Sequence, residues 1–288
     1  MYRPSSGATH NMIPTEKHQG FNISPAEEAP KGPVLLMEKQ EAHDQFHRGN
    51  PHDLTVLLRL TTVITLVNFG ETAESWFGEK VTVITTTTIN DKILSDLEWA
   101  DELGFIRVFN PDFHIPCDYP VYKENDPILR RKHVLKCLKG MIWMAQKLYG
   151  SKTKILPLIK GETPHERRLC YQVFKHLGIN YCVFYGTQYF TANIGFKKLQ
   201  EDLRTVVSEA PNLKIMLIGL QSPRRLKQLP PQIVAAAGQR WIGEVQLRDV
   251  PWSESQRLYK PMQEEIDAAL GQGQIPIMAW TSGEEVTA

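Results

Sequence analysis

The chain has 288 residues, of which 42% are hydrophobic, so it is long enough for one large domain or two small ones around a sizeable core. Its 33 basic and 32 acidic residues give a formal net charge of +1, which excludes a strong overall attraction to nucleic acid. No apolar run approaches the length of a membrane span, and the N-terminal residues lack the apolar segment of a secretory signal. We therefore expect a cytoplasmic protein without a membrane partner.

The spacing of the cysteines argues against a fold stabilised by a structural metal site or by disulfide bonds. Cys117, Cys137, Cys170 and Cys182 lie far apart, and no CxxC pair is present. We expect reduced thiols, no structural zinc and no cofactor.

The sequence divides into two parts. Residues 1–53 are polar, with scattered proline, glycine and histidine and no clear period, and are interpreted as an N-terminal arm or cap. Residues 54–288 alternate between apolar, β-branched runs and segments of helical period. Strands are predicted at 60–69, 80–89, 105–110, 152–161, 179–186, 213–220, 232–238 and 275–280. Helices are predicted at 91–103, 125–150, 163–178, 196–206, 222–226 and 253–270.

This alternation predicts an α/β fold, namely a TIM-like (β/α)8 barrel with an irregular N-terminal extension. The strands are nearly continuous apolar runs, as expected when both faces of a parallel sheet are buried. No GxGxxG or GxxxxGK[ST] motif supports an open nucleotide-binding sheet.

Active sites of such barrels lie at the carboxyl ends of the strands. Polar, aromatic and glycine residues gather at those predicted ends, above all in the stretch "FNPDFHIPCDYPVY" at 109–122. This mixture suits a planar polar ligand, whose edge is read by carboxylates and amides and whose face stacks on aromatic rings. The candidates are Asp112, His114, Asp118, Lys160, Gly161, Tyr185, Gly186, Gln188 and Gln221.

Each candidate has an alternative interpretation. Asp112 can be a turn residue and His114 a satisfied structural histidine. Lys160 can be a Schiff-base or general-base lysine, or the ion-pair partner of an aspartate. The glycines can reflect turn geometry alone.

The sequence also allows a phosphate site and a metal site. Arg224 and Arg225 follow a predicted strand and can bind a phosphate near the barrel mouth. Asp112, His114 and Asp118 can form a metal site with Glu162, which would make the chain a metal-assisted hydrolase or lyase.

From the third predicted strand onward, four segments resemble the tRNA-guanine transglycosylase superfamily, including archaeal proteins of this barrel type. They are "PDFHIPCDYPVY" with the helix "LKGMIWMAQKL", then "LPLIKG", "GINYCVFYGTQYF" and "IMLIGLQSPRRL". These enzymes are TIM barrels that exchange guanine for a 7-deazaguanine. The resemblance implies that Asp118 recognises the base and that Lys160, Gly161 and Gly186 stand at base contacts.

The chain also departs from that family. The position of the family's nucleophilic aspartate reads "AAAGQRW", and both the zinc motif and the "SGGFQ" segment are absent. The resemblance thus implies recognition of a guanine or 7-deazaguanine, free or within a nucleic acid, without the family's covalent route. If the chain is an enzyme, a base-exchange glycosyltransferase or N-glycosidic hydrolase using Asp112 or Asp118 is expected. A non-catalytic nucleobase-binding protein or partner subunit stays open, as does the oligomeric state.

Overall fold

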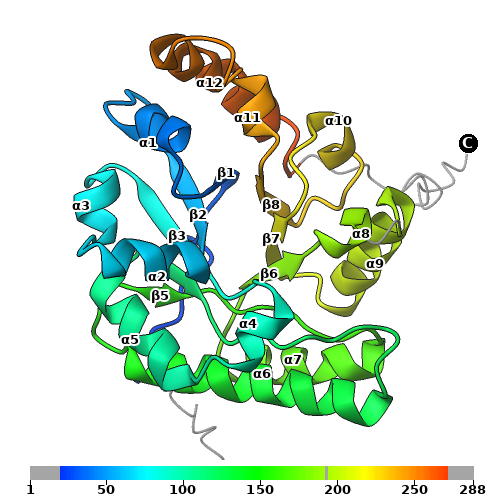
Figure 1. The fold of residues 1–288 in the computed structure, drawn as a ribbon. Helices are drawn as coiled ribbons and strands as arrows, with labels where there is room; N and C mark the ends of the chain where they lie inside the picture. Colours follow the sequence, from blue (N-terminus) through cyan, green and yellow to red (C-terminus); the bar gives the residue numbers. More distant parts are fainter. Residues whose placement is uncertain (1–19, 192–193, 272–288) are drawn as a thin grey trace, which may run out of the picture.

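The computed structural model describes residues 20–191 and 194–271. Eight parallel strands form one curled sheet in the order β5-β4-β3-β2-β1-β8-β7-β6, with helices packed around it (Figure 1). The strands are β1 (Gly32–Met37), β2 (Thr55–Arg59), β3 (Thr82–Thr86), β4 (Phe113–Ile115), β5 (Lys154–Ile155), β6 (Tyr181–Tyr185), β7 (Lys214–Ile218) and β8 (Ile233–Gly238). The helices are α1 (Glu41–His47), α2 (Leu60–Asn68), α3 (Ala73–Phe77), α4 (Asp91–Ser95), α5 (Trp99–Phe109), α6 (Pro127–Lys147), α7 (Pro164–His176), α8 (Gln188–Thr191), α9 (Phe196–Glu209), α10 (Pro223–Leu226), α11 (Trp241–Glu244) and α12 (Trp252–Asp267).

The two edge strands of the sheet approach each other without forming a ladder. Leu158, just beyond β5, and Val183 of β6 form an isolated parallel bridge. The Val183 amide donates to the Pro157 carbonyl at 2.7 Å, and the Ile159 amide donates to the Val183 carbonyl at 3.0 Å. The structure therefore shows an all-parallel sheet whose curl brings the carboxyl ends of its strands toward one region.

Side chains fill the concave side of the sheet. Alternate residues of the strands point inward, because successive side chains of a strand point to opposite faces. This inner cluster is apolar and includes Val34, Leu36, Leu57, Ile84, Phe113, Ile115, Tyr181, Val183, Met216, Ile218, Ala235 and Ala237. Polar chemistry is consequently confined to the ends of the strands.

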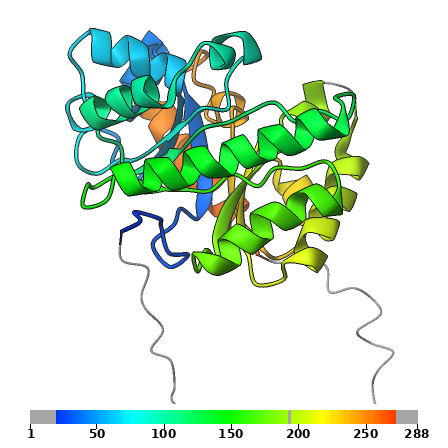
Figure 2. The same cartoon turned by 90° about the horizontal axis from the view of Figure 1, so that it is seen from below.

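Most predicted elements from residue 80 onward are confirmed. Asn90 caps α4, Asp126 caps α6 with Pro127 in the first turn, and Thr163 forms the predicted capping box of α7. Helices α6 and α7 lie beside each other along one side of the molecule (Figure 2). The strands predicted at 80–89, 179–186, 213–220 and 232–238 correspond to β3, β6, β7 and β8.

Two predicted strands are helices. The 60–69 run forms α2, which buries Leu60, Val63 and Leu66 at helical spacing, so tertiary packing overrides β-branched propensity. The 105–110 run is the end of α5, which continues through Gly104 and stops at Asn110 in the left-handed conformation.

The first strand of the sheet lies where an arm was expected. β1 pairs with β2 and β8, although its residues fall inside the polar 1–53 segment. The strand predicted at 275–280 lies outside the described residues.

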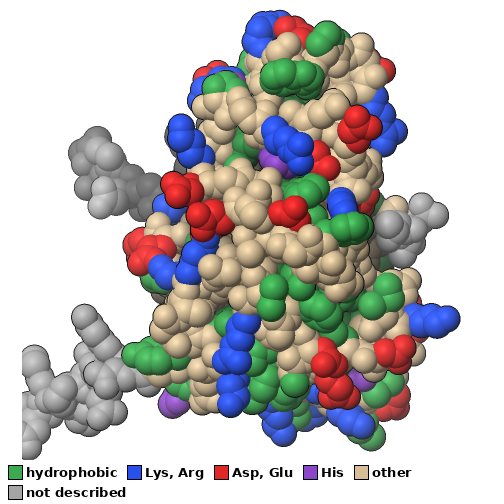
Figure 3. All heavy atoms as spheres, turned by 60° about the vertical axis from the view of Figure 1, so that its left-hand side comes forward, with side chains coloured by type: hydrophobic (Ala, Val, Ile, Leu, Met, Phe, Trp, Pro, Cys, Tyr) green, Lys and Arg blue, Asp and Glu red, His purple; other side chains and the backbone are tan. Residues whose placement is uncertain are grey.

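Charges of both signs are interspersed on the face seen in Figure 3, in keeping with the balanced composition. Within residues 20–191 and 194–271, every helix is either too short or too polar to cross a membrane.

Gly140 of α6 is a packing requirement that can be tested. A Cβ there would lie 2.6 Å from the Cys117 Cβ and 2.9 Å from the Trp99 ring. Gly140→Ala should therefore lower the free energy of unfolding by about 1–3 kcal/mol through overpacking. Gly104→Ala in α5 is the matched control, because nothing lies within 4 Å of its added Cβ.

The control substitution should raise the free energy of unfolding by about 0.5–1 kcal/mol, since alanine is the better helix former. Urea denaturation measures both variants. Equal effects of the two substitutions would show that the contact of α6 with the 116–120 turn does not constrain the fold.

Candidate functional site

The turn after β4 carries the central candidate, Asp118. Pro116 and Pro120 flank it, and Cys117 adopts a positive φ of 54°. The Asp118 amide donates to Thr87 Oγ1 at 3.0 Å, and the Cys117 amide donates to Glu102 Oε1 at 3.1 Å. Hydrogen bonds from two neighbouring elements thus hold this turn in a conformation that costs a non-glycine residue free energy.

Asp118 and Lys160 form a buried ion pair at the carboxyl ends of β4 and β5. Lys160 Nζ lies 2.5 Å from Asp118 Oδ1, and the two side chains are only 12% and 10% exposed. Burial raises the pKa of the Asp118 carboxyl, and the Lys160 ammonium opposes that shift. Burial lowers the pKa of Lys160, but the Asp118 carboxylate outweighs it and the net pKa shift is upward. The short contact with Asp118 thus supports the ion-pair interpretation of Lys160 over that of a nucleophile.

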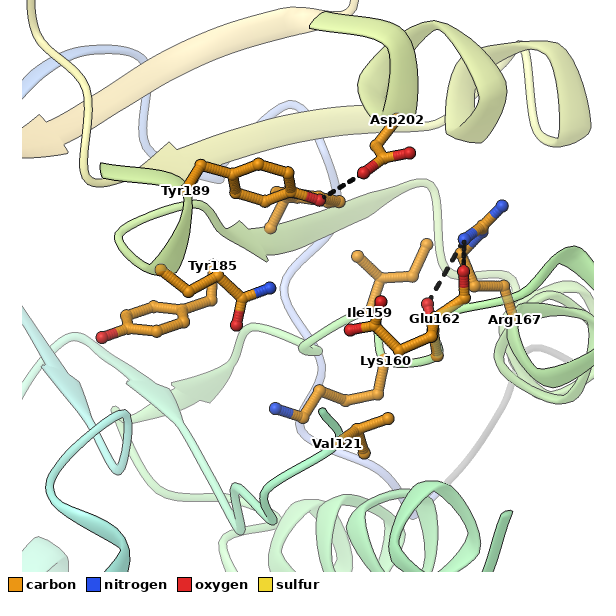
Figure 4. Close-up of a pocket in the computed structure, with 11 residues that line it drawn as sticks. Val121, Ile159, Lys160, Glu162, Arg167, Tyr185, Tyr189 and Asp202 are labelled. Atoms are coloured by element: carbon orange, nitrogen blue, oxygen red, sulfur yellow. Dashed lines mark hydrogen bonds between the residues drawn. The ribbon is translucent and has the colours of Figure 1, made fainter. Parts of the chain in front are cut away.

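Lys160 of this pair also lines a cavity of about 50 Å³, whereas Asp118 lies behind it and is not part of the lining (Figure 4). Tyr185 and Gln188, at and just after the end of β6, line it together with Lys160, Gly161 and Glu162. Its far wall carries a second polar group, in which the Tyr189 hydroxyl donates to Asp202 Oδ2 at 2.7 Å.

Burial and the nearby Asp202 carboxylate raise the pKa of Glu162. A carboxyl whose pKa is raised at a cavity is a candidate for proton transfer. Sequence reasoning missed Asp202, because a single acid on an amphipathic helix carries no distinguishing signal.

Two side chains of α7, Glu166 and Arg167, hold the loop from Lys160 to Thr163 through hydrogen bonds to its backbone. Glu166 accepts from the amides of Glu162 and Thr163 and from Arg130 Nε, the last at 2.8 Å. Arg167 donates to the carbonyls of Gly161 and Glu162 while it pairs with Glu209. The capping-box pattern predicted the role of Glu166, whereas nothing local marked Arg167.

His114 does not face the cavity. It is fully buried on β4, with Nε2 2.8 Å from Glu102 Oε1 and Nδ1 2.8 Å from Thr85 Oγ1. The flanking Phe113 and Ile115 point into the sheet interior, so alternation turns His114 outward toward α5. The structure supports the alternative of a satisfied structural histidine.

Asp112 lies at the opposite end of the sheet. It precedes β4, accepts from the Val83 amide at 2.8 Å and pairs with Lys152 at 3.1 Å. Asp112 was assigned a catalytic role because a strand was predicted at 105–110. That segment is the end of α5, so Asp112 does not lie at the carboxyl end of a strand.

The proposed metal ligands are consequently not brought together. Asp112, His114 and Asp118 each have a different protein partner, and Glu162 lies across the cavity from Asp202. In the part of the chain that the structure describes, no three histidine, cysteine or acidic side chains are grouped to hold a metal ion.

The remaining candidates have structural partners. A Cβ at Gly161 would lie 2.8 Å from the Arg167 amide, and one at Gly186 would lie 2.9 Å from Leu217, so the fold itself requires glycine at both. Gln221 is buried and donates to the Val34 carbonyl at 2.9 Å, inside the sheet. Arg225 stacks on the rings of Phe190 and Phe196, and Arg224 is exposed beside it on α10.

The end of β1 adds polar groups that the sequence analysis overlooked. Glu38 pairs with Arg59 at 2.8 Å, and its amide donates to His43 Nδ1 at 2.9 Å. One turn along α1, His47 is 1% exposed, and both of its ring nitrogens lack a hydrogen-bond partner within the described residues.

The Asp118–Lys160 pair predicts a specific pattern of stability changes. Lys160→Met should lower the free energy of unfolding by about 3–5 kcal/mol, because it leaves a buried carboxylate unpaired. The double variant Asp118→Asn, Lys160→Met should recover most of that loss, since no buried charge remains. Urea denaturation of the wild type, both single variants and the double variant measures the coupling. Additive effects would mean that the two side chains do not interact.

His47 predicts a pH dependence. Burial, then Arg48 and His43, lower its pKa from 6.5 to about 4. Between those values the unfolded chain binds a proton that the folded chain does not, so stability falls as the pH drops from 6.5 to 4, by about 3 kcal/mol. His47→Phe should remove this loss while its ring packs against Phe77. Denaturation at pH 7 and pH 4 measures it, and an unchanged pH dependence in the variant would contradict the assignment.

The sequence was compared with protein-family models and with curated proteins. No protein-family model matches the sequence, and no curated protein is significantly similar to it. The function proposed below therefore rests on the residues of this site.

Proposed function

We propose that the protein binds a guanine or 7-deazaguanine base, with the polar edge of the base against the Asp118–Lys160 pair. The observation that carries the proposal is this pair, buried at the carboxyl ends of β4 and β5 with its charged atoms 2.5 Å apart. A carboxylate beside an ammonium presents an acceptor next to a donor.

The edge of guanine is the complement of that arrangement. Its N1–H and 2-amino groups are adjacent donors, and its O6 is the neighbouring acceptor. Asp118 would accept from the two donors, and Lys160 would donate to O6. Charge-assisted hydrogen bonds of this kind are about twice as strong as neutral ones.

The neighbouring side chains support a planar ligand. Tyr185 supplies an aromatic face and Gln188 an amide at the same cavity. Because the cavity holds only about 50 Å³, a base inserts its polar edge, and the rest of the ring requires Tyr185 or Gln188 to move.

The proposal adopts base recognition from the resemblance to the transglycosylases but not their covalent chemistry. β8 ends at Gly238, and Gln239 and Arg240 follow it, so no carboxylate stands there to act as a nucleophile. Glu162, whose pKa is raised by burial, is the group of this cavity suited to donate a proton to a leaving base. A closed (β/α)8 barrel, a nucleic acid as carrier of the base and a cytoplasmic location belong to the same proposal.

Calorimetric titration with free bases tests the proposal directly. Guanine and 7-deazaguanine should bind, and hypoxanthine, which lacks the 2-amino donor, should bind at least about tenfold more weakly, or ~1.4 kcal/mol. Adenine reverses the donor pattern and should bind at least about tenfold more weakly than guanine. Failure of the wild-type protein to bind guanine, or equal binding of guanine and adenine, would refute the proposal.

Asp118→Asn should weaken guanine binding by roughly 2–4 kcal/mol, because it replaces an acceptor with a donor. The substitution also removes the charge partner of the buried Lys160, so a stability loss is expected as well. Binding must therefore be measured at a temperature where denaturation shows the variant to be folded. Asp112→Asn, at the opposite end of the sheet, is the matched control and should bind guanine like the wild type.

A further inference from the structure

A second and larger cavity lies on the outer side of the turn that carries Asp118. It has a volume of about 400 Å³, against about 50 Å³ for the cavity beside Lys160. Tyr119 and Pro120 of the turn separate it from the interior, α4 and the start of α5 form one wall, and α6 forms the other. Figure 1 shows α4 next to α6 in this region. The volume falls in the range typical of small-molecule sites, so a complete ring system fits.

Two aromatic side chains form a fixed wall of this outer cavity. Trp99 Nε1 donates to the Tyr119 hydroxyl at 2.6 Å. On its other side, Trp99 packs against Trp143 with 6.0 Å between the ring centroids. Because Trp99 is held by Tyr119 and Trp143, its ring can stack on a planar ligand without a large loss of side-chain entropy.

Two basic side chains of α6 stand at the same cavity. Lys136 is exposed and has its Nζ 4.4 Å from the centre of the Tyr119 ring. Within residues 20–191 and 194–271, no ion pair or hydrogen bond of Lys136 to an acidic side chain is found. His133 Nδ1 lies 2.5 Å from the Pro120 carbonyl and therefore carries a proton there, which fixes the ring and leaves Nε2 for other partners. A cation on an aromatic face with no carboxylate partner is well placed to receive an anion.

Acidic groups lie at the other side of the cavity. Asp91 accepts from the Tyr122 hydroxyl at 2.9 Å, and Glu98 lines the same wall. The cavity thus offers an aromatic wall between a basic side and an acidic side. An anion without ring N–H or amino groups would offer no hydrogen-bond donor to Asp91 and Glu98. A neutral base would offer no negative charge to Lys136. A ligand that carries both a base and an anionic group satisfies both sides of the cavity.

We propose that this outer cavity binds a nucleoside monophosphate unit, free or as one residue of a single strand. The base stacks on the Trp99 ring with its amino group toward Asp91, and the phosphate lies at Lys136, which covers the neighbouring Tyr119 ring. This site is distinct from the proposed guanine position at Asp118 and does not depend on it. If both are occupied, two ligands lie on opposite faces of one short turn.

Calorimetric titration of the full chain with adenosine 5′-monophosphate tests the proposal, because adenine is not expected at the Asp118 site. Adenosine should bind at least about tenfold more weakly than the monophosphate, since it lacks the charge that Lys136 receives. Inorganic phosphate alone should bind more weakly still. A short oligoadenylate distinguishes a free nucleotide from a nucleotide within a single strand. Binding about tenfold tighter than that of the mononucleotide would identify a single strand as the ligand. Equal binding would identify the free nucleotide as the ligand.

Lys136→Ala should weaken binding of the monophosphate by about tenfold. Lys139→Ala is the matched control, because Lys139 is exposed on the same helix but does not line the cavity, and its effect should stay within about twofold. Thermal denaturation confirms that both variants are folded.

Two results would overturn the proposal. They are no binding of adenosine 5′-monophosphate at millimolar concentration, or equal losses in the two lysine variants. Loss of guanine binding in Asp118→Asn with monophosphate binding retained would support separate sites. Failure of the guanine proposal alone leaves the monophosphate result unaffected, so the two proposals fail independently.

Discussion

The buried carboxylate of Glu102 is the constraint on which the site depends. It lies on α5, 1% exposed, and faces both the His114 ring and the Cys117 amide. A buried carboxylate is costly unless its oxygens are hydrogen-bonded, so the positions of α5, β4 and the following turn are coupled. Because Cys117 is held at a positive φ by this contact, the next residue, Asp118, is directed toward Lys160. The Asp118 carboxylate is thus positioned by a second carboxylate that is almost fully buried.

Lys160 is positioned by an independent network. Glu166 accepts from the amides of the loop after β5, while Arg167 donates to its carbonyls and is in turn held by Glu209. Each partner of the Asp118–Lys160 pair is therefore held by its own set of hydrogen bonds. Preorganisation of this kind lowers the entropic cost of bringing them together and partly offsets their desolvation. A ligand can share the pair's hydrogen-bonding capacity without having to order the loops.

Sequence patterns predicted the second half of the chain far better than the first. Caps and prolines in first turns, such as Asp126 with Pro127, specify helix starts locally, and β6 to β8 are apolar runs bounded by turn residues. Between residues 60 and 110, β-branched and aromatic residues lie on buried helix faces, and only the three-dimensional packing decides between strand and helix. β1 escaped notice because its six residues interrupt a polar segment without any flanking periodicity.

The same ambiguity explains which site residues could be predicted. Asp112 and Asp118 were both selected because the end of α5 was interpreted as a strand that precedes them. Asp118 nevertheless lies at the carboxyl end of β4 beside Lys160, because the short strand β4 separates the two aspartates and leaves Asp112 at the opposite end of the sheet. Glu102 lies on α5, and nothing in the sequence shows that this position of the helix is buried. A charged residue there is therefore interpreted as a surface residue. This short turn, held by Glu102, Thr87 and two prolines, places different groups on its two faces: a charged pair toward the sheet, and toward α6 an aromatic cavity with a basic and an acidic side.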